Sequence, residues 1–334
     1  MCTAITLHTK DHYFGRNLDY EITFGEQLVL TPRGYELQYK CLTGQLPDRV
    51  TGQMKKHFAM LGMAVVAEDY PLYFDAFNEK GLAMAALRFA GNAHYENPGN
   101  EEEFSEEAAM RKNDIAPYEL IPWVLSQCEN VSQAKELLIQ TRVAAVPFNK
   151  KIPLSPLHFM VADKKGHAIV AEPLKEGLKI YDNPVGVLTN NPPFLYHLEN
   201  LNNYLNLTAE PPVNRFSPEI TLKPYSRGMG ALGLPGDVSS ASRFVRAAFM
   251  RANSVCGESE HESVNQFFHI LGNVEQVRGC AHLENGCYEI TTYSACCNQD
   301  KGIYYYRTYE DFTIRSVHMQ KLNLEGNRCV ILEC

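Results

Sequence analysis

A cysteine stands second in the chain, and an arginine and an aspartate follow it at a spacing that suits one reaction centre. The sequence begins MCTAITL and runs on to GRNLD, which supplies Cys2, Arg16 and Asp19. Aminopeptidases remove an initiator methionine that precedes a small residue, so we expect Met1 to be removed. Cys2 would then carry a thiol beside an α-amino group of pKa about 7.7 to 8.0. Nucleophile and base would belong to one residue.

The two charged residues fit a cysteine nucleophile. A cation such as Arg16 favours the thiolate, and a carboxylate such as Asp19 can hold the amine by a hydrogen bond. The same residues also have an ordinary explanation, because a cysteine is most often a small hydrophobic residue and an exposed ion pair contributes under ~1 kcal/mol. Their spacing alone leaves both explanations open.

The elements predicted around these residues would bring them together. TAITLH (3–8) and YFGRNLD (13–19) have the pattern of two strands joined at residues 10–12. An antiparallel pair of this kind returns residues 16–19 alongside the N-terminus. A second hairpin is expected where YFDAF runs into Asn78-Glu79-Lys80-Gly81, a turn sequence that lies between two apolar runs.

The rest of the chain groups its predicted helices and strands in blocks. This order favours an α+β fold, with antiparallel sheets between helical layers, over alternating βα units. No repeat or linker divides residues 1–334, so a single domain is expected. The predicted helices cover 121–128, 132–143 after the cap Asn130, 241–255 and 264–274, and the later strands cover 157–163, 167–173, 178–184, 287–295, 302–309 and 312–319.

Two stretches lack any regular pattern. Residues 96–107 are rich in glutamate and are expected to form a solvated loop or the frayed start of a helix. Residues 197–240 are interrupted throughout by Asn, Pro and Gly. A segment of this length is either disordered, or a functional or assembly loop.

Composition excludes several classes of partner. The 31 Lys and Arg residues are outnumbered by 39 Asp and Glu residues, for a net charge of -8. Neither nucleic acid nor an anionic membrane is an expected partner for such a chain. The sequence has no run of 18 apolar residues and no signal-peptide pattern, so we expect a cytoplasmic protein.

Metal and cofactor motifs are equally weak. The ten cysteines include no C-x-x-C pair, so reduced thiols are expected rather than disulfides or a zinc site. Gly228, Gly230 and Gly233 satisfy G-x-G-x-x-G, but Pro224 and Pro235 disfavour the strand and helix that a dinucleotide site needs. No metal and no cofactor is therefore expected.

Several short motifs appear together in an order typical of one enzyme family. They are MCTAITL, GRNLD, FNEKGLAMA, VLTNNP, GLPGDVSSASRF and KGIYYYRTY. Their combination resembles the choloylglycine hydrolase family, which contains conjugated bile salt hydrolases and penicillin V acylases. The resemblance implies the N-terminal nucleophile hydrolase fold, a four-layer αββα sandwich, and activity against amide bonds.

The resemblance also implies roles for single residues. Cys2 becomes the nucleophile, with Arg16 and Asp19 as its electrostatic and orienting partners. Asn190 of VLTNNP becomes an oxyanion donor, a group whose loss typically costs roughly 10² to 10³ in rate. Arg243 of ASRF becomes a cation that faces the reacting centre. Without the resemblance, Asn190 is a turn residue and Arg243 a charge on a surface helix.

One position departs from the family pattern. Arg88 of ALRFAG stands where the bile salt hydrolases have Asn and the penicillin acylases have Tyr. The family uses mainly the backbone N–H there as an oxyanion contact, and Arg supplies the same N–H. The Arg88 side chain therefore bears on specificity: it either pairs with the sulfonate or carboxylate of a taurine or glycine conjugate, or points to solvent.

Apolar segments near the predicted site suggest an acyl-binding wall. A steroid needs a broad apolar slot, and ordinary core packing is the competing explanation for each of these residues. The irregular 197–240 region resembles the family's extended assembly loop, which implies a homotetramer. The candidate wall residues are Leu18, Phe24, Met63, Ala64, Val65, Val66, Val143, Val146 and Phe148.

We therefore predict hydrolysis of the amide bond of glycine- or taurine-conjugated bile salts. A penicillin V or N-acyl homoserine lactone acylase would use the same catalytic residues with a different pocket. A catalytically inactive binder of amphipathic anions is a second alternative. A thiol-rich structural protein would require that Met1 be retained.

Overall fold

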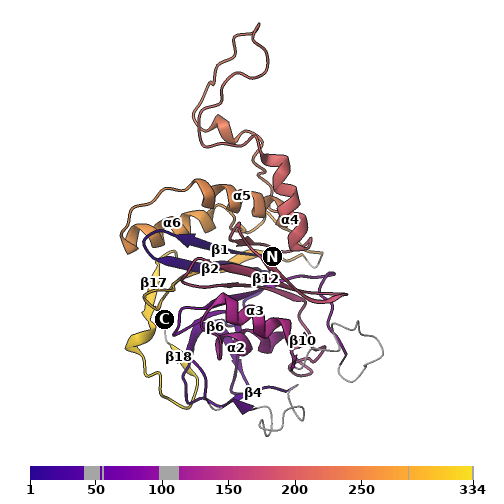
Figure 1. Cartoon of the computed structure of the whole chain (residues 1–334), viewed down its shortest axis with the longest axis vertical. Helices are drawn as coiled ribbons and strands as arrows, with labels where there is room; N and C mark the ends of the chain where they lie inside the picture. The colour runs from indigo at the N-terminus through magenta and orange to yellow at the C-terminus, as the bar shows by residue number, and fades with distance from the viewer. Residues whose placement is uncertain (41–52, 55, 98–112, 285, 333–334) are drawn as a thin grey trace.

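Two antiparallel sheets lie face to face at the centre of the molecule (Figure 1). The computed structural model describes residues 1–40, 53–54, 56–97, 113–284 and 286–332. Most of the glutamate-rich stretch 96–107 lies outside the described residues. The six-stranded sheet has the order β14 (Val187–Leu188), β1 (Cys2–His8), β2 (His12–Tyr20), β15 (Ile290–Asn298), β16 (Ile303–Thr308) and β17 (Arg315–His318).

The eight-stranded sheet is built largely from the middle of the chain. Two short pairs, β4 (Leu37–Gln38) with β5 (Gln53–Met54) and β9 (Asn113–Ile115) with β10 (Thr141–Val143), lie outside it. Its order is β13 (Gly177–Asp182), β12 (Ala168–Leu174), β11 (Leu157–Ala162), β8 (Ala83–Arg88), β7 (Tyr70–Asn78), β6 (Met60–Ala67), β3 (Gln27–Thr31) and β18 (Val330–Leu332).

Helices cover the outer face of each sheet. The long helices α5 (Ser240–Asn253) and α6 (Glu260–Gly272) pack on the six-stranded sheet, with α4 (Phe194–Asn200) beside α5 (Figure 1). The shorter α2 (Leu120–Leu125) and α3 (Val131–Ile139) pack on the eight-stranded sheet. The predicted α+β class and its four-layer αββα arrangement are therefore confirmed.

Both predicted hairpins are present. In the first, Cys2 pairs with Leu18 and Ala4 pairs with Arg16. The second joins β7 to β8, and the Asn78 side chain accepts hydrogen bonds from the backbone N–H groups of Lys80 and Leu82.

One predicted helix is too long. The pattern over 132–143 predicted helix to its end, but α3 stops at Ile139 and Thr141–Val143 form β10. The β-branched Thr141 and Val143 suit a strand, and Asn113–Ile115 supply a parallel partner that only the tertiary structure provides. The start of the helix is as predicted, because the Asn130 side chain accepts a hydrogen bond from the Gln133 N–H.

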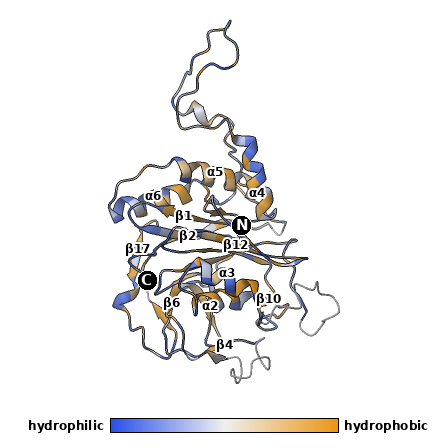
Figure 2. Cartoon of the chain, viewed as in Figure 1, coloured by the Kyte–Doolittle hydropathy of each residue, from blue (hydrophilic) through white to orange (hydrophobic). Residues whose placement is uncertain are grey.

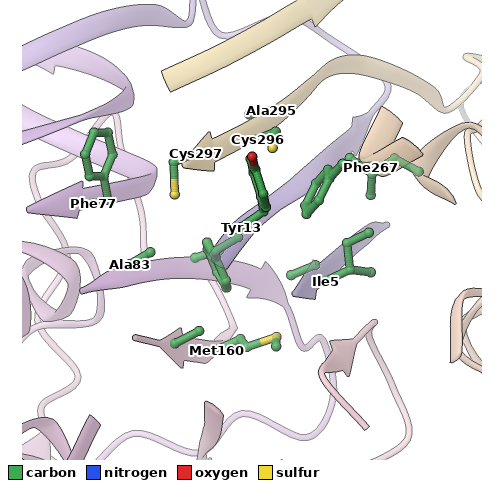
Figure 3. Close-up of a cluster of buried hydrophobic side chains, with 14 of the residues drawn as sticks. Ile5, Tyr13, Phe77, Ala83, Met160, Phe267, Ala295, Cys296 and Cys297 are labelled. Atoms are coloured by element: carbon green, nitrogen blue, oxygen red, sulfur yellow. The ribbon is translucent and has the colours of Figure 1, made fainter. Parts of the chain in front are cut away.

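Two hydrophobic clusters hold the layers together. One lies between the sheets and under α5 and α6; it includes Ile5, Phe77, Met160 and Phe267 (Figure 3). The other lies between the eight-stranded sheet and α2 and α3, around the buried Trp123. The cysteines that the structure describes are free thiols, and in these ranges no helix is long and apolar enough to cross a membrane.

The irregular region after α4 projects away from the layers (Figure 1). Hydrophobic and hydrophilic stretches are mixed along it (Figure 2). Its G-x-G-x-x-G stretch forms one 3₁₀ turn at Met229–Ala231, with no strand immediately before it. A dinucleotide site of this motif would need a strand before it and a helix after it.

Candidate active site

Cys2 lies at the start of β1, and its thiol is buried between the two sheets. The residue is 3% exposed, and its Sγ accepts a hydrogen bond from Arg16 Nη2 at 2.7 Å. Arg16 stands diagonally across the hairpin from Cys2, two residues before its direct partner Leu18. Residues placed in this way lie on one face of a sheet, so the spacing that the sequence displays brings guanidinium and thiol together.

Arg16 is held by the neighbouring sheet. Its Nη1 donates to the carbonyl oxygens of Phe74 at 3.0 Å and Ala86 at 2.6 Å. Burial works against its charge, but the surrounding Cys2, Tyr293 and Asp75 side chains raise its pKa above the usual value for arginine. The side chain is therefore a fixed cation that favours negative charge on the sulfur.

Asp75 is a functional candidate that sequence reasoning missed. Its carboxylate is buried near Arg16 and accepts hydrogen bonds from the hydroxyls of Tyr293 at 2.5 Å and Tyr304 at 2.6 Å. Burial raises the pKa of Asp75, and the Arg16 charge opposes that rise. A single charged residue inside the apolar run YFDAF was the signal that could have drawn attention to it.

Asp19 and Arg243 approach Cys2 from the opposite face of the six-stranded sheet. Arg243, on α5, donates to the Cys2 carbonyl oxygen at 2.5 Å and lies 3.9 Å from Asp19 Oδ2. Thr291 donates to Asp19 Oδ1 at 2.6 Å, whereas Oδ2 has no hydrogen-bond donor among the described residues. Burial raises the pKa of Asp19 and lowers that of Arg243.

Asn190 completes the cluster from the end of β14. Its Oδ1 accepts hydrogen bonds from the Cys2 N–H at 2.8 Å and from Arg243 Nη2 at 2.7 Å. Two donors on one oxygen fix the orientation of the amide. Its Nδ2 donates to the Arg88 carbonyl oxygen at 2.7 Å. The cluster thus joins residues of β1, β2, α5 and the segment that follows β14.

Met1 covers the amine end of this cluster. Its α-ammonium donates to the Asp19 carbonyl oxygen at 2.9 Å and forms an ion pair with Glu289. Burial lowers the pKa of this ammonium. Glu289 was not predicted from the sequence, because nothing in CYEITTYSA marks its glutamate as lying beside the N-terminus.

The Arg88 side chain lies outside the cluster. It is exposed, and its guanidinium stands 5.7 Å from the centre of the Tyr20 ring. Its backbone carbonyl oxygen, by contrast, accepts the hydrogen bond from Asn190. The side chain therefore stands at the edge of the site, as the specificity prediction requires, and its role stays a prediction.

The candidate acyl wall divides between the two cores. Leu18 and Met63 belong to the inter-sheet cluster with Cys2, and Met63 also borders an inter-sheet cavity of about 230 Å³ that Cys2 does not line. Ala64 and Val143 belong to the cluster beyond the eight-stranded sheet. For these last two, the position favours ordinary core packing, the alternative that the sequence left open.

The remaining wall residues lie nearer the surface or against other aromatic rings. Phe24 is 39% exposed and its ring stands 4.6 Å from that of Tyr20. Phe148 is buried against Tyr70 and Tyr118. Val65, Val66 and Val146 are half-buried. Across the described ranges, no three His, Cys, Asp or Glu side chains gather where they could hold a metal ion.

Comparison with known proteins agrees with this geometry. The family model for linear amide C–N hydrolases of the choloylglycine hydrolase family matches residues 2–332. The chain belongs to this family. A relative from Lactiplantibacillus plantarum, named bile salt hydrolase/transferase, is 50% identical over 330 residues, which cover 99% of this chain and 96% of the relative.

Two solved structures have the same architecture as this chain. A variant of the conjugated bile acid hydrolase from Clostridium perfringens superimposes with a TM-score of 0.87 at 36% identity, covering 100% of this chain and 97% of that chain. Penicillin V acylase from Agrobacterium tumefaciens gives a TM-score of 0.70 at 18% identity, covering 98% and 90%. The second likeness concerns the fold alone.

Proposed function

We propose that the protein hydrolyses the amide bond of bile acids conjugated to glycine or taurine, with Cys2 as an N-terminal nucleophile. The observation that carries this proposal is the 2.7 Å contact between Arg16 Nη2 and Cys2 Sγ, inside a cluster that also holds Asn190, Asp19 and Arg243. The names of the relatives supply the substrate class, because a bile salt hydrolase/transferase is 50% identical to this chain.

Removal of Met1 would complete the site. The Cys2 amide would become an ammonium with further N–H donors, and the unsatisfied Oδ2 of Asp19 would gain a partner. Glu289 and the Asp19 carbonyl oxygen would lose the Met1 ammonium that they now bind. The mature amine could then give up and take back a proton beside the sulfur.

The reaction would proceed in two halves. The Cys2 thiolate attacks the amide carbonyl carbon, and the resulting oxyanion accepts hydrogen bonds from Asn190 Nδ2 and the Arg88 N–H. The carbon–nitrogen bond breaks as the α-ammonium gives its proton to the leaving glycine or taurine. The free amine then takes a proton from water, the hydroxide adds to the thioester, and the carbon–sulfur bond breaks to restore the thiolate.

The test is amine release from taurocholate, glycocholate and penicillin V by purified protein, with intact mass recorded in parallel. We expect a mass without Met1, release of taurine or glycine, and no release by a Cys2→Ala variant. If only 6-aminopenicillanic acid were released, the substrate would be a penicillin and not a bile salt. Binding of bile salts without turnover would favour the inactive binder.

The projecting region supports a further part of the proposal, assembly into a homotetramer. Its apolar side chains are unusually exposed, with Phe216 at 82% and Tyr225 at 85%. Such residues on an extended segment mark an interaction surface, and a second copy of the chain is the partner we propose. Sedimentation analysis should give a tetramer, and a Phe216→Asp, Tyr225→Ser variant should give smaller species.

A further inference from the structure

The buried pair His158 and Glu172 lies directly behind Asn190 and has no part in the reaction proposed above. Both residues are 0% exposed. They stand on the neighbouring strands β11 and β12, and His158 Nδ1 lies 2.9 Å from Glu172 Oε1. A buried ion pair contributes little more stability than an apolar pair of the same size, so stability alone is a weak reason for its presence.

The contacts of His158 fix its hydrogens and its ring. Its Nε2 lies 2.9 Å from the Thr189 carbonyl oxygen, and a carbonyl only accepts, so Nε2 carries a hydrogen and donates it. The ring stacks on Phe89 with 4.2 Å between the centroids. The other ring nitrogen, Nδ1, faces the Glu172 carboxylate. The ring therefore holds Thr189, the residue just before Asn190, in one place.

Glu172 holds the other end of the same segment. Its two carboxylate oxygens accept the Phe194 N–H at 3.0 and 3.1 Å, at the first residue of α4. His197, one turn along that helix, donates from Nε2 to the Asn190 carbonyl oxygen at 2.9 Å. The His158–Glu172 pair thus anchors the chain on both sides of Asn190 and Asn191.

The segment that carries Asn190 depends on anchors outside the β14 ladder, and Ser240 Oγ, which accepts the Asn190 N–H at 2.8 Å, is another of them. β14 is an edge strand of two residues, Val187 and Leu188, and pairs with β1 at Ile5 and Ala4. Asn190 lies beyond the end of this pairing. A ladder this short leaves the following residues free to move unless other groups hold them. Precise placement of the oxyanion donor is required, because a shift of about 1 Å in a catalytic group can cost about 10² in rate.

We propose that His158 and Glu172 are positioning residues for Asn190, which tie the oxyanion donor of one sheet to the other sheet. This inference rests on the proposed function, since Asn190 matters as a donor only in that reaction. The pair acts through the Thr189 carbonyl oxygen and the Phe194 N–H, and none of its hydrogen bonds reaches Cys2. Its effect is expected on turnover rather than on substrate binding.

Two substitutions separate positioning from simple loss of a buried histidine. His158→Gln keeps a donor where Nε2 stood and should keep the bond to Thr189, whereas His158→Asn keeps a donor only where Nδ1 stood. We expect His158→Asn to lower kcat by about 10², as loss of an oxyanion donor does, with KM within about twofold. His158→Gln should retain kcat within about threefold.

His57 is the matched control. It is also buried, and its two ring nitrogens lie 2.8 and 2.7 Å from the carbonyl oxygens of Phe58 and Tyr35. Neither of these contacts involves Asn190 or the residues next to it. His57→Gln and His57→Asn should leave kcat unchanged whatever they do to the melting temperature. An equal fall in kcat for both His158 variants, or the same pattern at His57, would overturn the positioning role.

Crystal structures of the variants give a readout that does not depend on bile salt turnover. Asn190 Oδ1 should stay within hydrogen-bond distance of the Cys2 nitrogen in His158→Gln and move away in His158→Asn. An unmoved Asn190 in His158→Asn would refute the inference even if the wild type hydrolysed no bile salt. If His158→Asn does not fold, Glu172→Gln takes its place, and an unmoved Asn190 with unchanged kcat would again refute it.

Discussion

The two faces of the eight-stranded sheet bury ionisable groups in different ways. On the inner face, Asp75, His158 and Glu172 each contact or face another ionisable side chain, and Arg16 reaches in from the other sheet. Beneath the outer face, the buried carboxylate of Glu119 bonds mainly to backbone N–H groups, those of Lys40 at 2.6 Å and Ala116 at 3.0 Å.

This difference separates the buried groups that bear on the reaction from those that hold the fold together. Asp75 lies near the Arg16 guanidinium and so shares in the electrostatics of the thiol, whereas Glu119 accepts backbone N–H groups and ties a loop to a helix start. Changes on the inner face should therefore lower turnover. Changes beneath the outer face should alter stability and leave turnover alone.

The largest effect is expected at Arg16. Arg16→Lys keeps a charge but loses the planar fork that bonds Cys2 Sγ and two carbonyl oxygens at once. We expect kcat to fall by about 10² to 10³, as for loss of a preorganised donor, measured as taurine release. Arg251→Lys is the control, because Arg251 likewise donates to a strand carbonyl oxygen, that of Thr6 at 2.6 Å. An Arg16→Lys variant as active as this control would remove Arg16 from the catalytic group.

Asp75→Asn should have a smaller effect, about tenfold on kcat, or about 1.4 kcal/mol. It removes the negative charge near Arg16 while keeping a similar shape. Burial raises the pKa of Asp75, so the wild-type carboxylate is neutralised at a higher pH than an ordinary aspartate. The difference in kcat between the wild type and Asp75→Asn should therefore become smaller as pH falls.

The control for Asp75 is Asp114→Asn. Asp114 is buried too and accepts a hydrogen bond from Arg142 Nη2 at 2.6 Å, but it stands on β9, outside both large sheets. Its replacement should leave the pH profile of kcat unchanged. If the difference in kcat between the wild type and Asp75→Asn were the same at every pH, the charge of Asp75 would have no part in turnover.

Arg88→Asn should change substrate binding rather than turnover. An exposed ion pair contributes up to about 1 kcal/mol, so KM for the anionic conjugates should rise by up to about fivefold with kcat nearly constant. Steady-state kinetics with glycocholate and taurocholate would measure this. Arg278→Asn is the control, because Arg278 is also exposed and stands 5.1 Å from an aromatic ring centre, that of Tyr309. If Arg88→Asn and Arg278→Asn had equal KM values, the Arg88 side chain would not pair with the substrate anion and would simply point to solvent.

Glu119→Gln should leave kcat unchanged and alter only the pH dependence of stability. Burial raises the pKa of Glu119 from 4.5 to about 7. The folded wild type therefore binds a proton more tightly than the unfolded chain, and this stabilisation is full below pH 4.5 and lost as pH rises through about 7.

Urea unfolding measures this change. Between those two pH values the wild type should lose about 3 kcal/mol relative to Glu119→Gln. The exposed Glu258→Gln variant serves as the control and should track the wild type at each pH. If the free energy of unfolding of the wild type changed with pH in parallel with that of Glu119→Gln, the prediction would be contradicted.

The hairpin at the N-terminus was predictable from local pattern. Strand pairing of residues close in sequence needs only a turn and alternating side chains, and it placed Arg16 beside Cys2. The same alternation puts Asp19 on the opposite face from the thiol, next to the backbone of Cys2. The helix predicted to run through Thr141–Val143 was wrong there, because its competing strand partner lies 28 residues earlier in the chain, in the pairing of Arg142 with Asp114.

The sequence by itself therefore indicated the N-terminal hairpin, a candidate nucleophile with its cation, and the α+β class with antiparallel sheets between helices. The rest of the site depends on contacts between distant segments: Asn190 is 188 residues and Arg243 is 241 residues from Cys2. A resemblance pointed to those two, but it pointed to neither Asp75, Glu289 nor the pair His158 and Glu172. These groups gain their partners only when the two sheets pack together, because burial and distance, rather than residue type, decide which charges meet.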